Sequence, residues 1–194
     1  MVGREGDGVR REQLVRSAYL RVAEVGFEGL RLRQVADDVG IDHSTLHHHI
    51  ATKQELVNAV AEYATSQFWS TMPDDPDATA ALRGHLAEIR RLFEQQPELF
   101  TVTAELDLRA RRDPVVRALM DGYEAGWRTE LRRVLVRGAE QGAWPATGLD
   151  DTVELVIAAV KGARLAPAVA DRVFDRLTAV LTSTEGTPLR TERT

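Results

Sequence analysis

Four of the five histidines fall between His43 and His49, and Ser44 and Thr45 lie in the same segment. Short hydroxyl side chains and imidazoles can donate hydrogen bonds to phosphate oxygens and can reach the edges of bases in a groove. This concentration of side chains has the chemistry of a nucleic-acid-binding surface. It can act as one only if a helix presents the side chains on the same side.

The apolar residues around this segment predict two short helices joined by a tight turn. Ala36 is small enough for a close helix crossing, Gly40 can adopt the positive φ that the turn needs, and Leu46 closes the core from the second helix. The positions expected to be buried together are Leu32, Val35, Ala36, Val39, Leu46 and Ile50. The pattern is that of a helix-turn-helix, although ordinary helical hairpins can share it.

Helical periodicity turns the polar side chains of the second helix away from Leu46 and Ile50. This outward face is compact and is expected to be free of acids; its residues are Ser44, Thr45, His47 and His48. Arg31 and Arg33 lie at the start of the preceding helix, close to where a duplex backbone would pass. Lys53, one of two lysines in the chain, begins the next helix and can hold a phosphate there.

The histidines also allow a different interpretation. His43 and His47 are four residues apart, the spacing with which two imidazoles on one helix share a zinc ion. However, the chain has no cysteine and no His-Glu-x-x-His pattern, and both side chains already have a use on the outward face. We therefore expect no metal site and no cofactor.

Residues 10–56 resemble the DNA-binding domain of the tetracycline-repressor (TetR) family. Its members typically have an alanine, a glycine four residues later, and a Thr-Leu-Tyr-x-His/Tyr-Phe-x-x-Lys run. In this chain Ala36 and Gly40 are followed by the run Thr45-Leu46-His47-His48-His49-Ile50-Ala51-Thr52-Lys53. The resemblance implies a homodimer that binds a palindromic double-stranded DNA operator.

The resemblance also implies roles for single residues. Thr45, His47 and Lys53 would contact phosphates, and the residues placed to read bases would be Arg33, His43, Ser44 and His48. Three positions depart from the family pattern: His47 replaces a tyrosine, Ile50 replaces a phenylalanine, and Arg31 replaces the Ser or Thr that often opens the second helix. An imidazole is shorter than a phenol and titrates near neutral pH, so the contact of His47 would differ from that of a tyrosine.

Prolines and glycines divide the chain into predicted helices, and no segment shows the two-residue alternation of a strand. The predicted ranges are roughly 9–25, 32–39, 43–50, 53–70, 77–95, 97–110, 113–140, 149–164 and 167–183. The fold class we predict is all-α: an N-terminal three-helix helix-turn-helix domain followed by a C-terminal helical ligand-binding and dimerisation domain, about nine helices in all.

Several helix starts have a predicted cap. Asp113 precedes Pro114, Asp150 or Asp151 can cap the next helix, and Thr52 with Glu55 forms a capping box in which Glu55 reaches back to the Thr52 amide. In the first helix we expect one buried face, made of Leu14, Ala18, Val22 and Val25. Phe27, in the segment that ends this helix, is expected to fill the core.

We predict a DNA-binding domain at residues 1–52, an effector-binding and dimerisation domain at 53–183, and a flexible tail at 184–194. From residue 53 onward the resemblance is architectural. Ligand sites in helical bundles are mostly apolar with a few polar groups. The candidate pocket residues are Phe68, Trp69, His85, Arg90, Phe93, Phe100, Glu105, Met120, Tyr123 and Trp127.

The last two predicted helices are apolar enough to seek a partner, and the resemblance implies a four-helix dimer interface there. The candidate interface residues are Val153, Val156, Ile157, Val160, Val173, Leu177 and Val180. Dimerisation matters because the net charge is −5, and residues 1–56 carry eight Lys and Arg against nine Asp and Glu. DNA contacts must then be local, and two copies on one palindrome would reinforce each other.

Composition excludes several other classes of protein. The 194 residues are 43% hydrophobic, enough for a core, yet no apolar run is long enough for a membrane span, and the charged start is unlike a signal peptide. We expect a cytoplasmic regulator, a repressor released from its operator by a small-molecule effector. No nucleophile elbow, phosphate loop or metal triad indicates an enzyme. An activator, a ligand-independent regulator, or a helical interaction protein with weak or lost DNA binding remain alternatives.

Overall fold

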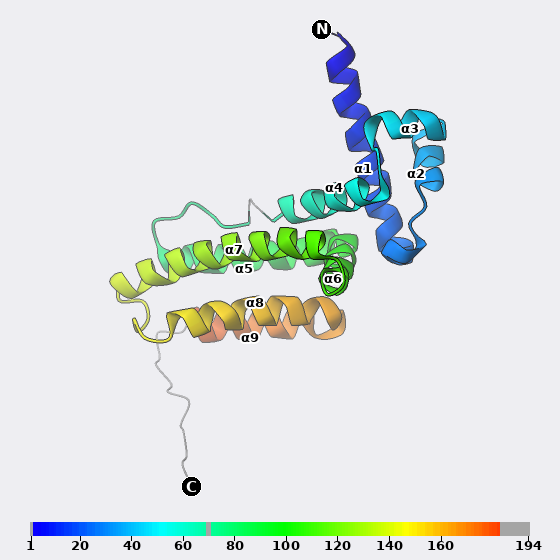
Figure 1. Cartoon of the computed structure of the whole chain (residues 1–194). Helices are drawn as coiled ribbons and strands as arrows, with labels where there is room; N and C mark the ends of the chain where they lie inside the picture. The colour runs from blue at the N-terminus through cyan, green and yellow to red at the C-terminus, as the bar shows by residue number, and fades with distance from the viewer. Residues whose placement is uncertain (1, 69–70, 183–194) are drawn as a thin grey trace. The chain divides into compact units, whose positions relative to one another are not determined.

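The computed structural model of the chain describes residues 2–68 and 71–182, with side chains from residue 8 onward. These residues form nine α-helices and one short 3-10 helix, without a strand among them (Figure 1). The elements are α1 (Val2–Gly29), α2 (Leu32–Val39), α3 (His43–His49), α4 (Lys53–Ser66), α5 (Ala78–Gln95), α6 (Pro97–Ala110), α7 (Pro114–Glu140), α8 (Leu149–Leu165), η1 (Pro167–Val169) and α9 (Ala170–Thr182). The predicted all-α class is confirmed. The predicted tail at 184–194 lies outside the described residues.

Two helix ends differ clearly from the prediction. α1 begins at Val2 rather than near residue 9, because each glycine lowers helix propensity by only about 1 kcal/mol and does not stop a helix by itself. α4 ends at Ser66 rather than 70. There the hydroxyls of Thr65 and Ser66 donate to the carbonyls of Ala61 and Tyr63, at 2.9 and 2.8 Å.

The predicted caps are confirmed at two helix starts and wrong at a third. Thr52 Oγ1 accepts the Glu55 amide at 3.0 Å, although the Glu55 carboxylate accepts the amide of Ala51 at 2.9 Å rather than that of Thr52. At the start of α7, Asp113 Oδ1 accepts the amides of Val115 and Val116 at 3.1 and 3.2 Å. α8 instead begins after Gly148 without a side-chain cap, since Asp150 and Asp151 already lie inside its first turn.

The chain divides into two compact units, and unit 1 contains residues 1–70 and 91–126. In it α1 contacts α2, α3, α4 and α6. Leu14, Ala18 and Val22 are completely buried as predicted, and Phe27 fills the core. The prediction for Val25 is wrong: its side chain is 51% exposed, immediately before the kink at Gly26.

Unit 2 contains residues 71–90 and the chain from residue 127 onward. Its core includes Leu82 and Leu131, together with apolar residues of α8 and α9. Gln141, just after α7, is bonded to the start of α5: its side chain accepts the Ala78 amide at 2.9 Å and donates to the Pro76 carbonyl at 2.7 Å. Across the described part of the chain, we find no helix with the length and apolar character needed to cross a membrane.

The packing of α7 against the Trp144 indole gives a test of the fold. A Cβ at Gly138 would overlap the indole, whose Nε1 donates to the Leu135 carbonyl at 2.7 Å. We expect Gly138→Ala to lower the free energy of unfolding by about 1–3 kcal/mol, measured by denaturant titration.

Gly162 of α8 is the matched control, because a Cβ there meets no neighbouring atom. Gly162→Ala should raise the free energy of unfolding by roughly 0.5–1 kcal/mol through helix propensity alone. Wild-type stability in the Gly138→Ala protein would contradict the close approach of Trp144.

Candidate nucleic-acid interface

The α2–α3 segment is a helix-turn-helix. Gly40 has φ 72°, and its amide donates to the Asp37 carbonyl while that of Ile41 donates to the Ala36 carbonyl. Leu46 and Ile50 are completely buried against α1 and α2. The two helices turn sharply against each other (Figure 1), so the face of α3 opposite Leu46 is directed away from the core.

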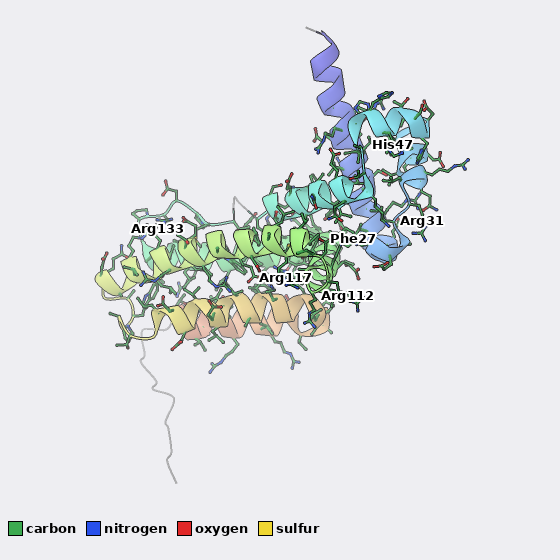
Figure 2. The ribbon with its side chains drawn as sticks, viewed as in Figure 1. Phe27, Arg31, His47, Arg112, Arg117 and Arg133 are labelled. Carbon is green, nitrogen blue, oxygen red and sulfur yellow. The ribbon has the colours of Figure 1, made fainter. Side chains whose placement is uncertain are left out.

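The predicted outward face of α3 is accessible. His43, Ser44, His47 and His48 are exposed, and Thr45 is partly exposed. The rings of His43 and His47 meet edge to face with centroids 4.6 Å apart. Figure 2 shows His47 on α3, with Arg31 near the start of α2. The arrangement brings five of the eight predicted DNA-contact residues together on one short helix.

Asp42, the residue before α3, was missed by sequence reasoning. Its carboxylate accepts hydrogen bonds from the Ser44 hydroxyl at 2.5 Å, the Thr45 hydroxyl at 2.6 Å and the Thr45 amide at 2.9 Å. The hydrogen bond from Ser44, and to a smaller extent that from Thr45, holds the pKa of Asp42 well below its usual range. The Asp42 carboxyl is therefore ionised near neutral pH. The expectation of an acid-free face is therefore wrong at one edge.

The predicted cations flank α3 in different ways. Arg33 is exposed on α2, and Arg31 donates to the backbone carbonyl of Glu28 at 2.6 Å. Lys53 Nζ donates to the Phe27 carbonyl at 3.2 Å. Burial, followed by the positive charges of Arg31 and Arg109, lowers the pKa of Lys53. A phosphate contact by Lys53 would have to share or replace its bond to Phe27.

Two polar clusters connect α1 with its neighbouring helices in unit 1. Arg21 binds Asp38 through two hydrogen bonds of 2.8 and 2.7 Å and so fixes α2 on α1, and Ser17 donates to the same carboxylate at 2.9 Å. Arg109 of α6 lies 5.4 Å from the Phe27 ring centroid and pairs with Asp113 at 3.1 Å. Arg109 thus contacts the end of α1 and the start of α7 within unit 1.

Comparison with known proteins assigns this architecture. The chain is 33% identical over 85 residues to the tetracycline repressor protein class C of Escherichia coli, a match that covers 43% of this chain and 39% of that protein. A TetR transcription regulator from Haloarcula marismortui has the same fold, with a TM-score of 0.80 at 18% identity over 91% of this chain and 96% of that chain. The chain thus has the fold of TetR transcription regulators, and over 85 residues its sequence is similar to that of a tetracycline repressor.

A second solved structure has the same fold. AibR in complex with isovaleryl coenzyme A and operator DNA has a TM-score of 0.74 at 18% identity, over 89% of this chain and 98% of that chain. No family model matches the chain. The sequence match to the tetracycline repressor spans well under half of that relative, whereas the similarity of fold to the two solved structures covers about nine-tenths of this chain.

The predicted pocket residues of this chain fall in both units. Unit 1 contains an aromatic cluster in which Phe93 stacks on Phe100 and Phe68 meets both Phe100 and Tyr123 edge-on or tilted. Met120 is buried in the same core, and Trp69 lies outside the described residues. Glu105 lies apart from these rings; it lines a surface cavity of about 700 Å³ with residues that include Phe27, Gln54 and Arg109.

The three pocket candidates of unit 2 are engaged within the protein. His85 is almost fully buried, and Trp127 Nε1 donates to its Nε2 at 2.8 Å. Burial lowers the pKa of His85 to about 4, which keeps the imidazole neutral at physiological pH. Arg90 forms ion pairs with Asp171 and Asp175 of α9, at 2.9 and 2.7 Å.

Most of the predicted dimer-interface residues are core residues of the protomer. Five of the seven are at most 6% exposed, namely Val153, Val156, Ile157, Val160 and Leu177. Val173 is partly buried, and Val180 is 49% exposed. Four of the five buried residues, Val153, Val156, Ile157 and Leu177, pack in one core cluster with residues of α5 and α7. In the described residues no three His, Asp or Glu side chains gather as metal ligands would.

The Arg21–Asp38 pair predicts a pH-dependent stability. We expect Asp38→Asn to lower the free energy of unfolding near neutral pH by up to about 1 kcal/mol, because both side chains are partly exposed. The pKa of Asp38 is lowered mainly by the hydrogen bond from Arg21 and to a smaller extent by that from Ser17. The stability that the pair contributes is therefore present above the ordinary Asp pKa and is lost as pH falls through the lowered pKa.

Denaturant titration at neutral and acidic pH measures the difference between wild type and Asp38→Asn, which should shrink in acid. Asp37→Asn removes the neighbouring exposed carboxylate of α2 and serves as control, with little effect expected at either pH. A deficit in Asp38→Asn that is the same at both pH values would contradict an electrostatic clamp.

Proposed function

We propose that this chain is a sequence-specific transcriptional repressor of the TetR family that binds a palindromic operator as a homodimer and is released by a small-molecule effector. The observation that carries the proposal is the exposed edge of α3, where Ser44, His47 and His48 are held outward by the burial of Leu46 and Ile50. A helix presented in this way fits the major groove, where its first residues reach base edges.

The charge distribution supports local rather than bulk binding of DNA. A chain with net charge −5 cannot hold a duplex through a general positive field, because such binding needs many cations that displace counterions. Arg31 and Arg33 before α3 and Lys53 after it would supply a few phosphate contacts. Two such sets on one palindrome would combine their affinities.

A second copy of the chain is expected on the outer faces of α8 and α9. Leu155, Leu165 and Val180 of these helices are 52%, 75% and 49% exposed, and a second copy seated on them would remove this apolar surface from water. We therefore propose an interface of Leu155, Leu165 and Val180 in place of the one predicted from the sequence. Only Val180 belongs to both sets.

An effector is proposed by analogy and by composition. AibR, which shares the fold, was solved with both an acyl-coenzyme A and operator DNA. In this chain the aromatic rings of Phe68, Phe93, Phe100 and Tyr123 form an apolar cluster in unit 1, where we propose that an effector binds. A ligand that binds one arrangement of the protein better than another would change operator affinity by that difference in binding free energy.

Two observations favour a second candidate function. Asp42 places an ionised carboxylate beside the hydroxyls expected to meet DNA, and Lys53 is bonded to Phe27. Both features weaken attraction to phosphate. A helical interaction protein with weak or lost DNA binding is the alternative that they support.

Selection of bound sequences from a random duplex pool tests the proposal. The wild type should enrich a palindromic motif. His48→Ala should weaken binding to that motif by roughly tenfold at fixed salt, because one good base contact contributes about 1–3 kcal/mol. Lys53→Ala should weaken binding to every duplex, because a phosphate contact carries no sequence information. Fluorescence anisotropy measures the affinities, and circular dichroism checks the helix content.

Arg133→Ala is the matched control for these variants. Arg133 is an exposed arginine of α7 in unit 2 that pairs with Glu130 at 2.9 Å (Figure 2). Its replacement removes one positive charge without touching the interface, and we expect unchanged affinity. Enrichment of no sequence by the wild type would overturn the proposed function and favour the interaction protein.

Sedimentation velocity tests the dimer. Leu155→Glu should shift the protein from dimer to monomer, because a carboxylate would be buried in the proposed interface without a partner. Leu108→Glu changes an equally exposed leucine of unit 1, 54% against 52%, and should leave the dimer intact. A wild-type monomer at micromolar concentration would contradict the interface.

A further inference from the structure

The carboxylate of Asp42 fixes the hydrogen atoms of two hydroxyls at the edge of α3. Ser44 and Thr45 each carry one hydroxyl hydrogen, and both hydrogens are donated to Asp42, at 2.5 and 2.6 Å. A hydroxyl that has donated its hydrogen can only accept further hydrogen bonds. Asp42 and Ser44 are exposed and Thr45 is partly exposed, so their remaining lone pairs face solvent.

This edge therefore offers acceptors without donors. Phosphate oxygens, guanine O6 and N7, adenine N7 and thymine O4 are themselves acceptors and cannot pair with it. The donors in the major groove are the amino groups of cytosine N4 and adenine N6. Each base pair has one such amino group, on a strand that depends on the orientation of the pair. The chemistry of the edge matches an amino group and opposes a phosphate.

We propose that Asp42 is a positioning residue for base recognition: it holds Ser44 and Thr45 as acceptors, so that this edge of α3 reads the amino group of a cytosine or adenine in the operator. The inference rests on the proposed function, and it revises the expected roles of two residues. Thr45 then reads a base edge instead of contacting a phosphate, and the expected base contact of Ser44 is limited to an amino group.

The same geometry makes Asp42 a determinant of selectivity. An ionised carboxylate close to the groove repels phosphates when no amino group is present to pair with it. Removing its charge would free both hydroxyls to rotate and donate. Binding to unrelated DNA should then strengthen, while discrimination at the base pair that this edge reads should weaken.

Parallel selection from a random duplex pool tests the inference with wild type, Asp42→Asn and Ser44→Ala. Asparagine caps a helix as well as aspartate does, so α3 should remain folded. We expect Asp42→Asn to lose at least fivefold of the preference at one position in each half-site, and the other positions to keep theirs. Ser44→Ala should weaken the preference at the same position.

Asp37→Asn is the matched control, because it removes one exposed charge from the neighbouring helix α2 and should select the wild-type motif. The affinity of Asp42→Asn for a duplex lacking the motif should rise severalfold relative to Asp37→Asn. If Asp42→Asn selects the wild-type motif with undiminished preference at every position, the inference is overturned while the proposed function stands. Failure of the wild type to enrich any motif overturns the proposed function instead, and the inference with it.

Discussion

The burial of Leu46 and Ile50 is the constraint on which the rest of the interface depends. α3 has seven residues, and an isolated helix of this length is not stable in water. Its two apolar side chains, both completely buried against α1 and α2, therefore hold the helix in place and decide which side faces outward. The positive φ of Gly40 gives the chain the sharp change of direction that this burial requires.

Much of this arrangement could be predicted, because short-range spacing encodes it. The structure agrees with the predicted role of each residue in this spacing: Ala36 is buried, Gly40 has a positive φ, and Leu46 of the second helix is buried in the core. Most helix boundaries could also be placed, since prolines at helix starts and capping side chains act within a few residues. The all-α class followed from the same periodicity.

Other features depend on long-range packing that spacing does not reveal. Periodicity identified the apolar stripe of α8 but could not tell whether another helix of the same chain or a second copy covers it; Val156 proved to be core. Asp42 is a different case, because an aspartate three residues before Thr45 is an ordinary capping signal and does not by itself indicate a role in DNA binding. Its effect on the two hydroxyls became apparent only from the geometry.

Hydroxyl-radical footprinting on the selected duplex tests the central claim most directly, because it maps where the protein touches the backbone. The account predicts two protected patches on one face of the duplex, with centres about one helical turn of 34–36 Å, or a multiple of it, apart. A single continuous patch, or uniform protection along the duplex, would contradict recognition by a pair of α3 helices.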